Sequence, residues 1–143
     1  MNGYLLDTNV VSEYTRKSPP HPRVKRWVDA QVEDELYLSV LTLGEIRKGT
    51  TLLPTGDRRT QLQKWLEIDL PTRFVNRVLP VDADIADVWG VMSAQAQIKG
   101  IALGIVDGLL AATARHHSLT LATRNVKDFR NWGISLLNPW DLP

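Results

Sequence analysis

Residues 4–12 read YLLDTNVVS, and this stretch sets the first element of the fold. An apolar run of three residues ends at Asp7, two small polar residues follow, and Val10 and Val11 resume the apolar pattern. Such a run predicts a short buried strand that ends in a carboxylate. Asp7 either caps the next helix or places a negative charge at the end of the strand for a functional reason. One aspartate leaves both interpretations open.

The rest of the chain alternates short apolar runs with longer helical patterns, which is typical of a parallel sheet crossed by helices. Further strands are predicted at residues 36–39, 78–79, 119–122 and 134–139. Helices are predicted at residues 24–32, 41–53, 58–70, 82–100 and 106–117, and residues 123–129 read as a turn or short helix. The PTGD segment at residues 54–57 marks a turn that makes a protruding helical hairpin of its two neighbouring helices. The predicted fold class is α/β, one domain over residues 1–143 with a central parallel β-sheet of about four to five strands flanked by α-helices.

The composition excludes several kinds of site. The 143 residues include no cysteine, which removes disulfides, thiol catalysis and cysteine-ligated zinc. The N-terminus has no basic region before an apolar signal core, and no window is long enough to span a bilayer, so we expect a cytoplasmic protein without membrane contact. Because 17 Lys and Arg oppose 16 Asp and Glu, the net charge of +1 does not indicate a nucleic-acid binder.

Local basic clusters are the exception to this balance. They are Arg16 with Lys17, Arg23 with Lys25 and Arg26, Arg47 with Lys48, Arg58 with Arg59, and the set of Arg124, Lys127 and Arg130. Each cluster is either an ordinary solvated helix face or a set of phosphate contacts that the fold gathers.

Acidic side chains follow predicted strands or begin predicted helices. They are Asp7, Glu45, Asp107 and Asp128, the last one three residues after Asn125. Each has a structural interpretation: Asp7 as a cap, TLGE at residues 42–45 as a capping box, and Asp107 at the positive end of a helix dipole. The carboxyl ends of parallel strands lie along one edge of an open sheet, where ligands bind at the switch point. We therefore expect these acids to converge in one cleft.

Carboxylates in one cleft repel one another unless a divalent cation neutralises them. Hard oxygen ligands, with neither cysteine nor a paired-histidine motif, favour Mg²⁺ or Mn²⁺ over zinc. Magnesium held by carboxylates suits attack on phosphodiesters, because the ion lowers the pKa of a bound water and stabilises the leaving oxygen. Asp7 is then a metal ligand fixed by a rigid strand, and Thr8 and Asn9 hydrogen-bond around it.

Three segments resemble, in order and spacing, the PIN-domain nucleases: LLDTNVVSE, LSVLTLGEIRKG and VDGLLAATARHHSLTLATRNVKDF. The pattern is similar to that of the VapC-type toxins of bacterial toxin–antitoxin pairs, and LYLSVLTLGE and LNPWDLP are similar to their FitB-like branch. The resemblance covers essentially the whole chain. It implies a divalent-metal ribonuclease that blocks translation, a homodimer, and a small antitoxin that has a DNA-binding domain and a tail that wraps the toxin.

The resemblance also implies roles for single residues. Asp7, Glu45 and Asp107 match the most regular acids of the family site, and Thr123 matches a hydroxyl that positions the cluster. The chain departs where many relatives carry an aspartate, since that position is Asn125. Either Asn125 binds the metal through its carbonyl oxygen or a water, or Asp128 supplies the charge. The predicted site has catalytic Asp7, Glu45, Asp107 and Asp128, metal ligands Asp7, Glu45, Asp107 and Asn125, and supporting Thr8, Asn9 and Thr123.

Two other functions fit parts of the pattern. A dinucleotide-binding domain shares the strand–helix alternation, but no GxGxxG follows the first strand, and Asp7 there repels a pyrophosphate. A non-catalytic, regulatory PIN-like protein is favoured by Asn125 and disfavoured by the three acids. The predicted function is a toxin that hydrolyses RNA with Mg²⁺ or Mn²⁺ until its antitoxin neutralises it. The basic clusters then contact RNA phosphates or acidic groups of the antitoxin tail, and the sequence leaves both open.

Overall fold

The computed structural model describes residues 2–143 and contains a five-stranded sheet in the order β3-β2-β1-β4-β5. The strands are β1 (Tyr4–Leu6), β2 (Leu36–Ser39), β3 (Val78–Leu79), β4 (Thr120–Ala122) and β5 (Leu136–Leu137). All neighbouring strands are parallel, and Leu5 of β1 lies opposite Tyr37 on one side and Leu121 on the other. The predicted α/β class with a parallel sheet is confirmed.

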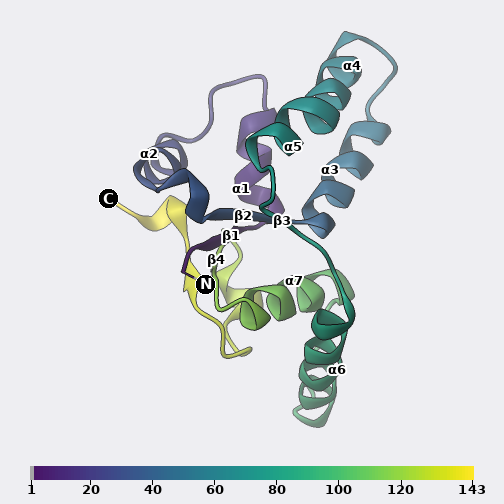
Figure 1. Ribbon diagram of the computed structural model, residues 1–143, viewed down its shortest axis with the longest axis vertical. Coiled ribbons are helices and arrows are strands. Elements are labelled where there is room, and N and C mark those ends of the chain that lie inside the picture. The colour runs from purple at the N-terminus through teal and green to yellow at the C-terminus, as the bar shows by residue number, and fades with distance from the viewer. Residues whose placement is uncertain (1) are drawn as a thin grey trace.

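Helices fill the connections between the strands (Figure 1). They are α1 (Thr8–Ser12), α2 (Pro22–Ala30), α3 (Val40–Leu52), α4 (Asp57–Lys64), α5 (Leu70–Arg73), α6 (Ala83–Ile98), α7 (Ile105–His116) and α8 (Val126–Phe129). Short 3₁₀ turns are η1 (Glu13–Thr15), η2 (Glu33–Glu35) and η4 (Pro139–Asp141), and η3 (Trp65–Asp69) is a π-helical segment. Among residues 2–143, no helix has both the length and the apolar character that a bilayer span requires.

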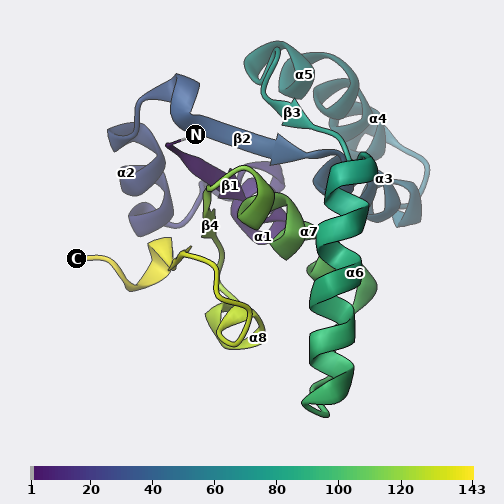
Figure 2. The ribbon, with the colours of Figure 1, turned by 60° about the horizontal axis from the view of Figure 1, so that its bottom comes forward.

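Successive strand residues enter two separate cores, because side chains alternate between the faces of a sheet. Leu6 packs in the core covered by α1, α2, α3 and α5, whereas Leu5 packs in the core covered by α6 and α7. Figure 1 shows the sheet between these two helical layers. Figure 2 shows α6 as a long helix that extends past the strands.

The strand order places a switch point between β1 and β4. From β1 the chain builds β2 and then β3 on one side, and after α6 and α7 it returns to add β4 and β5 on the other side. In open sheets of this kind ligands bind outside the carboxyl ends of the strands at such a point. Asp7 directly follows β1 and Thr123 directly follows β4, so both lie there.

The predicted hairpin exists, but it ends differently. Helices α3 and α4 pack against each other and project from the sheet (Figure 1). The predicted end near residue 70 is wrong, because the helix continues through η3 and α5 to Arg73 with Pro71 inside it. Proline lacks an N–H, and here the hydrogen-bond pattern changes to the π type just before it.

The predicted last strand, residues 134–139, is longer than the strand that forms. Only Leu136–Leu137 pair with β4. Asn138 ends the strand, because its Oδ1 accepts the N–H of Trp140 at 2.9 Å and starts the η4 turn.

Candidate active site

Asp7 both caps a helix and reaches the switch point, so the two interpretations of its sequence position are compatible. Its Oδ1 accepts the backbone N–H of Thr8 at 2.7 Å at the start of α1. Its Oδ2 accepts the hydroxyl of Thr123 at 2.8 Å. The carboxylate is therefore fixed by the start of α1 and by the residue that follows β4.

Asn9 reinforces this connection between β1 and β4. Its amide nitrogen lies 3.4 Å from Asp7 Oδ2 and 3.4 Å from Thr123 Oγ1. Its amide oxygen accepts the backbone N–H of Arg124 at 3.3 Å. Asn9 and Thr123 thus hold Asp7 through its second oxygen.

The environment of Asp7 disfavours an uncompensated negative charge. The side chain is buried, and burial raises its pKa above the ordinary value of 3.8. Hydrogen bonds from Thr123 and Thr8 partly offset this effect, while the nearby charges of Asp107 and Glu45 raise the pKa further. A bound cation relieves both the repulsion and the cost of burial.

Glu45 is joined to the first helix and is not part of a capping box. Helix α3 begins at Val40 because the Ser39 side chain accepts the N–H of Leu41 at 3.0 Å, so Ser39 is the cap. The capping-box interpretation of residues 42–45 is therefore wrong. Glu45 Oε1 instead accepts the hydroxyl of Thr8 at 2.6 Å.

Asp107 lies in the first turn of α7, and its carboxylate accepts no hydrogen bond from another described residue. Partial burial is the main cause that raises its pKa above 3.8, followed by the charges of Asp128 and Glu45. Asp107 is thus coupled electrostatically to acids from two other elements, α3 and α8.

Asp7, Glu45, Asp107 and Asn125 line one cavity of about 440 Å³, together with Thr8 and Asn9. Asn125 immediately precedes α8, and its side chain makes no hydrogen bond to the other described residues. Asp128 lies elsewhere, in a neighbouring cavity of about 430 Å³ that shares Asp107 with the first. The structure therefore brings Asn125 to the three acids and Asp128 to Asp107 alone.

The donors of this cavity suit a hard cation that keeps part of its water shell. Within residues 2–143, no three Asp, Glu or His side chains are arranged to hold one ion by themselves. Magnesium commonly retains several waters and is bound through one or two carboxylates plus substrate phosphates. The cavity lining offers four carboxylates and the amide oxygen of Asn125, with no sulfur and no imidazole, so one or two of these carboxylates with the amide fit such a site.

Four residues that the sequence did not assign to the site also line this cavity: Ser12, Glu13, Arg124 and Trp140. The Arg124 guanidinium lies 5.3 Å from the centre of the Trp140 ring. Glu13 is largely buried and accepts hydrogen bonds from Arg16 at 2.6 Å and from the His21 N–H at 2.8 Å. Arg124 belongs to a basic cluster and Trp140 to the LNPW segment, so the sequence contains a signal for both. Ser12 and Glu13 end the LLDTNVVSE segment, so the sequence contains a signal for them as well.

Comparison with known proteins agrees with this geometry. Residues 4–133 match the family model of the PIN domain. The chain is 41% identical to VapC ribonuclease Y4jK of Sinorhizobium fredii, over 96% of this chain and 97% of that one. It is 38% identical to toxin FitB of Neisseria gonorrhoeae, over 95% and 97% of the two chains.

Solved structures give the same result. The crystal structure of FitAcB from Neisseria gonorrhoeae matches with a TM-score of 0.91 at 38% identity, over 97% of this chain and 99% of that one. A structure of FitAB bound to the IR36 DNA fragment matches with a TM-score of 0.90 at 36% identity, over 98% and 97%. The chain therefore belongs to the PIN-domain family, in the VapC group that includes FitB.

Proposed function

We propose that this protein is the toxin of a toxin–antitoxin pair, an endoribonuclease that uses Mg²⁺ or Mn²⁺ to hydrolyse RNA phosphodiesters and so inhibits translation. The observation that carries the proposal is the gathering of Asp7, Glu45, Asp107 and Asn125 around one cavity at the switch point of the sheet. The names of the relatives, a ribonuclease and a toxin, support the activity and the role.

In this proposal Asp7, Asp107 and the amide oxygen of Asn125 hold the cation, with water completing its shell. A divalent cation in this position lowers the pKa of a bound water and neutralises charge on the phosphate. Thr123 and the Thr8 N–H keep Asp7 aimed at the cavity through bonds of 2.8 and 2.7 Å. This support matters because a carboxylate held on a rigid strand needs no reorganisation when the substrate binds.

Glu45 is the residue of the set best placed to move a proton. Its Oε1 is occupied by the Thr8 hydroxyl at 2.6 Å, and its Oε2 accepts no hydrogen bond from the described residues. The second oxygen is thus available to accept a proton from a water in the cavity and to pass it to the leaving oxygen. Thr8 fixes the orientation of the carboxylate during this transfer.

The partner in this proposal is an antitoxin with a DNA-binding domain. The solved relative FitAB, described as bound to a DNA fragment, supports a complex that pairs the toxin with such a protein. We also propose that the toxin is a homodimer and that it acts in the cytoplasm, where translation takes place. Light scattering of the purified chain measures the oligomeric state directly.

The proposal is tested by incubating the purified chain with a pool of single-stranded RNA oligomers, with Mg²⁺, with Mn²⁺ or with EDTA. We expect cleavage only with the metals. Glu45→Gln removes the proton acceptor and should lower the rate by about 10²- to 10⁴-fold. Asp107→Asn should raise the metal concentration needed by about tenfold or more. Asp87→Asn removes an exposed charge on α6, away from the cavity, and serves as the control.

Two outcomes contradict the proposal. Cleavage that persists in EDTA, or that survives both Glu45→Gln and Asp107→Asn, excludes this metal site as the catalytic centre. Binding of the metal without any RNA cleavage instead favours the alternative, a regulatory PIN-fold protein without catalytic activity.

A further inference from the structure

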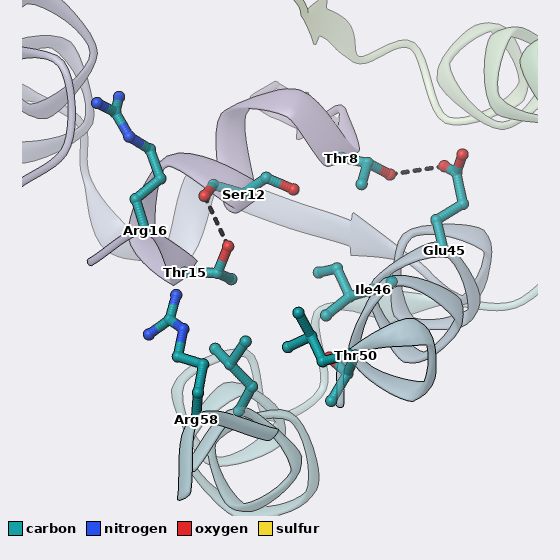
Figure 3. Close-up of a pocket in the computed structure, with 11 residues that line it drawn as sticks. Thr8, Ser12, Thr15, Arg16, Glu45, Ile46, Thr50 and Arg58 are labelled. Carbon is teal, nitrogen blue, oxygen red and sulfur yellow. Dashed lines mark hydrogen bonds between the residues drawn. The ribbon is translucent and has the colours of Figure 1, made fainter. Parts of the chain in front are cut away.

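A second pocket of about 350 Å³ lies beside the acidic cavity, and we call it the side pocket. It is bounded by α1, η1, α3 and α4, and it shares Thr8, Ser12 and Glu45 with the acidic cavity (Figure 3). Its volume lies in the range of small-ligand pockets, about 300 to 1,000 Å³. The side pocket is therefore large enough for a small ligand, and it adjoins the proposed catalytic site.

The wall of the side pocket is apolar on the side of the helical hairpin. Ile46, Leu53 and Leu62 line it from α3, its C-terminal end and α4. Gly49 lines it as well, and a Cβ atom built on Gly49 meets no heavy atom within 4 Å. The α3 backbone thus leaves open space against an apolar surface, which suits the flat face of a planar ring.

Polar side chains also line the side pocket, and some of them have no partner among the described residues. Arg16 is partly neutralised, because it donates to Glu13 at 2.6 Å. The Arg58 guanidinium and the Ser12 hydroxyl make no hydrogen bond or ion pair within the described chain. Figure 3 shows Arg16 and Arg58 at one end of the pocket and the Thr8–Glu45 hydrogen bond at the other. A ligand that spans the pocket meets positive charge at one end and the acidic cavity at the other.

We propose that the side pocket is a nucleotide subsite that binds one base of single-stranded RNA next to the phosphate that is cleaved. Arg58 contacts a neighbouring phosphate, and the Ser12 hydroxyl hydrogen-bonds the nucleotide. Proteins read single-stranded RNA by stacking unstacked bases on aromatic side chains or arginine planes and hydrogen-bonding their edges, and they bind its phosphates with arginine. In the side pocket, where none of the described lining residues is aromatic, the aliphatic wall contacts the base. The subsite rests on the proposed ribonuclease function and adds the selection of a base at a fixed distance from the cleaved bond.

An acidic antitoxin tail is the competing occupant of this pocket. The arrangement favours RNA, because the cleaved strand must pass through the acidic cavity, and the side pocket opens from that cavity through Thr8 and Glu45. A strand bound there reaches the unpaired Arg58 without leaving the protein surface. An acidic peptide gains from Arg58 as RNA does, but only the RNA must also enter the acidic cavity to be cleaved.

Filling the pocket is the first test. Gly49→Leu places an apolar side chain in the open space, and leucine favours a helix interior over glycine, so the fold should be as stable as wild type or more stable. We expect cleavage of a randomised single-stranded RNA pool to fall about tenfold or more and the base preference beside the cut to change. Gly90→Leu is the matched control, because Gly90 is an exposed helical glycine of α6 with equally open surroundings.

Removing the positive charge of Arg58 is the second test, and it measures RNA binding without catalysis. In an Asp107→Asn background, Arg58→Ala should weaken RNA binding and reduce the slope of log K against log salt by about one. Lys64→Ala removes the same charge from the same helix, but Lys64 does not line the pocket, so the slope should stay unchanged.

The outcomes separate the subsite from the catalytic proposal. A wild-type chain that cleaves no RNA overturns both. Cleavage by wild type that is unaltered in rate and base preference by Gly49→Leu, with an unchanged salt slope for Arg58→Ala, overturns the subsite alone. Loss of antitoxin binding in Gly49→Leu, with RNA cleavage intact, assigns the pocket to the antitoxin and likewise overturns the RNA subsite.

Discussion

At the scale of single residues, Asp7 illustrates how one carboxylate serves fold and site together. A carboxylate offers about four acceptor positions. Thr8, Thr123 and Asn9 occupy three of them, at 2.7, 2.8 and 3.4 Å. The remaining position is free for a ligand in the cavity. The hydrogen bonds that cap α1 and join β4 are thus the same ones that aim Asp7, so its loss should affect stability and activity together.

Thr123 gives a sharper test, because it supports the site without lining it. Its side chain is fully buried, donates to Asp7 and accepts the Asn125 N–H at 3.0 Å. Thr123→Val keeps the shape but leaves these groups unpaired, so the free energy of unfolding in urea should fall by about 1 to 3 kcal/mol. Mn²⁺ affinity should fall about tenfold or more. Thr123→Ser restores the hydroxyl and should recover both; equal behaviour of the Val and Ser variants rules out this role.

At the scale of elements, periodicity and caps predicted the pieces that depend on local sequence. Strands at residues 4–6, 36–39 and 78–79 formed where expected, and Asp82 caps α6 by accepting the Ile85 N–H at 3.0 Å. The π segment before Pro71 and the early start of α3 were missed. Both depend on local alternatives whose energies are similar until tertiary packing selects one, which a single sequence does not reveal.

The candidate site likewise has a part that the sequence predicted and a part that depends on tertiary packing. Asp7, Glu45 and Asp107 were predicted to converge because a parallel sheet places the ends of its strands along one edge. The existence of the side pocket depends on how side chains from α1, η1, α3 and α4 pack in space. Sequence spacing contains no information on such packing.

The position of α8 determines whether Asn125 or Asp128 lies beside Asp7, Glu45 and Asp107. Asn125, at the start of this helix, faces the cavity of Asp7 and Asp107, whereas Asp128 lines the neighbouring cavity. We therefore expect Asn125→Asp to tighten Mn²⁺ binding in calorimetry. Asp128→Asn should weaken it by less than the roughly tenfold loss that disturbing a supporting residue causes. A larger loss for Asp128→Asn than for Asn125→Ala makes Asp128 the ligand in place of Asn125 and contradicts this assignment.

At the scale of the whole molecule, the two cores meet at the strands that carry the site. Asp7 extends from β1, which packs into both cores, while Glu45 and Asp107 belong to helices on opposite faces of the sheet. Repulsion among these acids therefore acts across the sheet and opposes the packing of both helical layers. Metal binding should stabilise the global fold, and the effect should depend on pH.

The sign of that pH dependence follows from the raised pKa values of Asp7 and Asp107, both above the ordinary 3.8. The metal-free folded state binds protons more tightly than the unfolded chain. The free energy of unfolding of the metal-free protein therefore falls as pH rises from about 4 through the folded pKa values. Asp107→Asn removes one of these acids. In EDTA, its melting temperature relative to wild type should therefore rise between about pH 4 and pH 7, whereas Asp87→Asn should show no such trend.

Adding Mg²⁺ should reverse the order of the melting temperatures, so that wild type melts above Asp107→Asn. At a Mg²⁺ concentration 100 times its Kd, binding adds about 2.7 kcal/mol to the stability of wild type. Asp107→Asn should gain much less, because it has lost a ligand. Melting curves followed by circular dichroism at pH 7, with EDTA and with Mg²⁺, measure both effects on the same samples. If Asp107→Asn melts well below wild type in EDTA, Asp107 stabilises the start of α7 as a structural residue, and its role as a metal ligand is wrong.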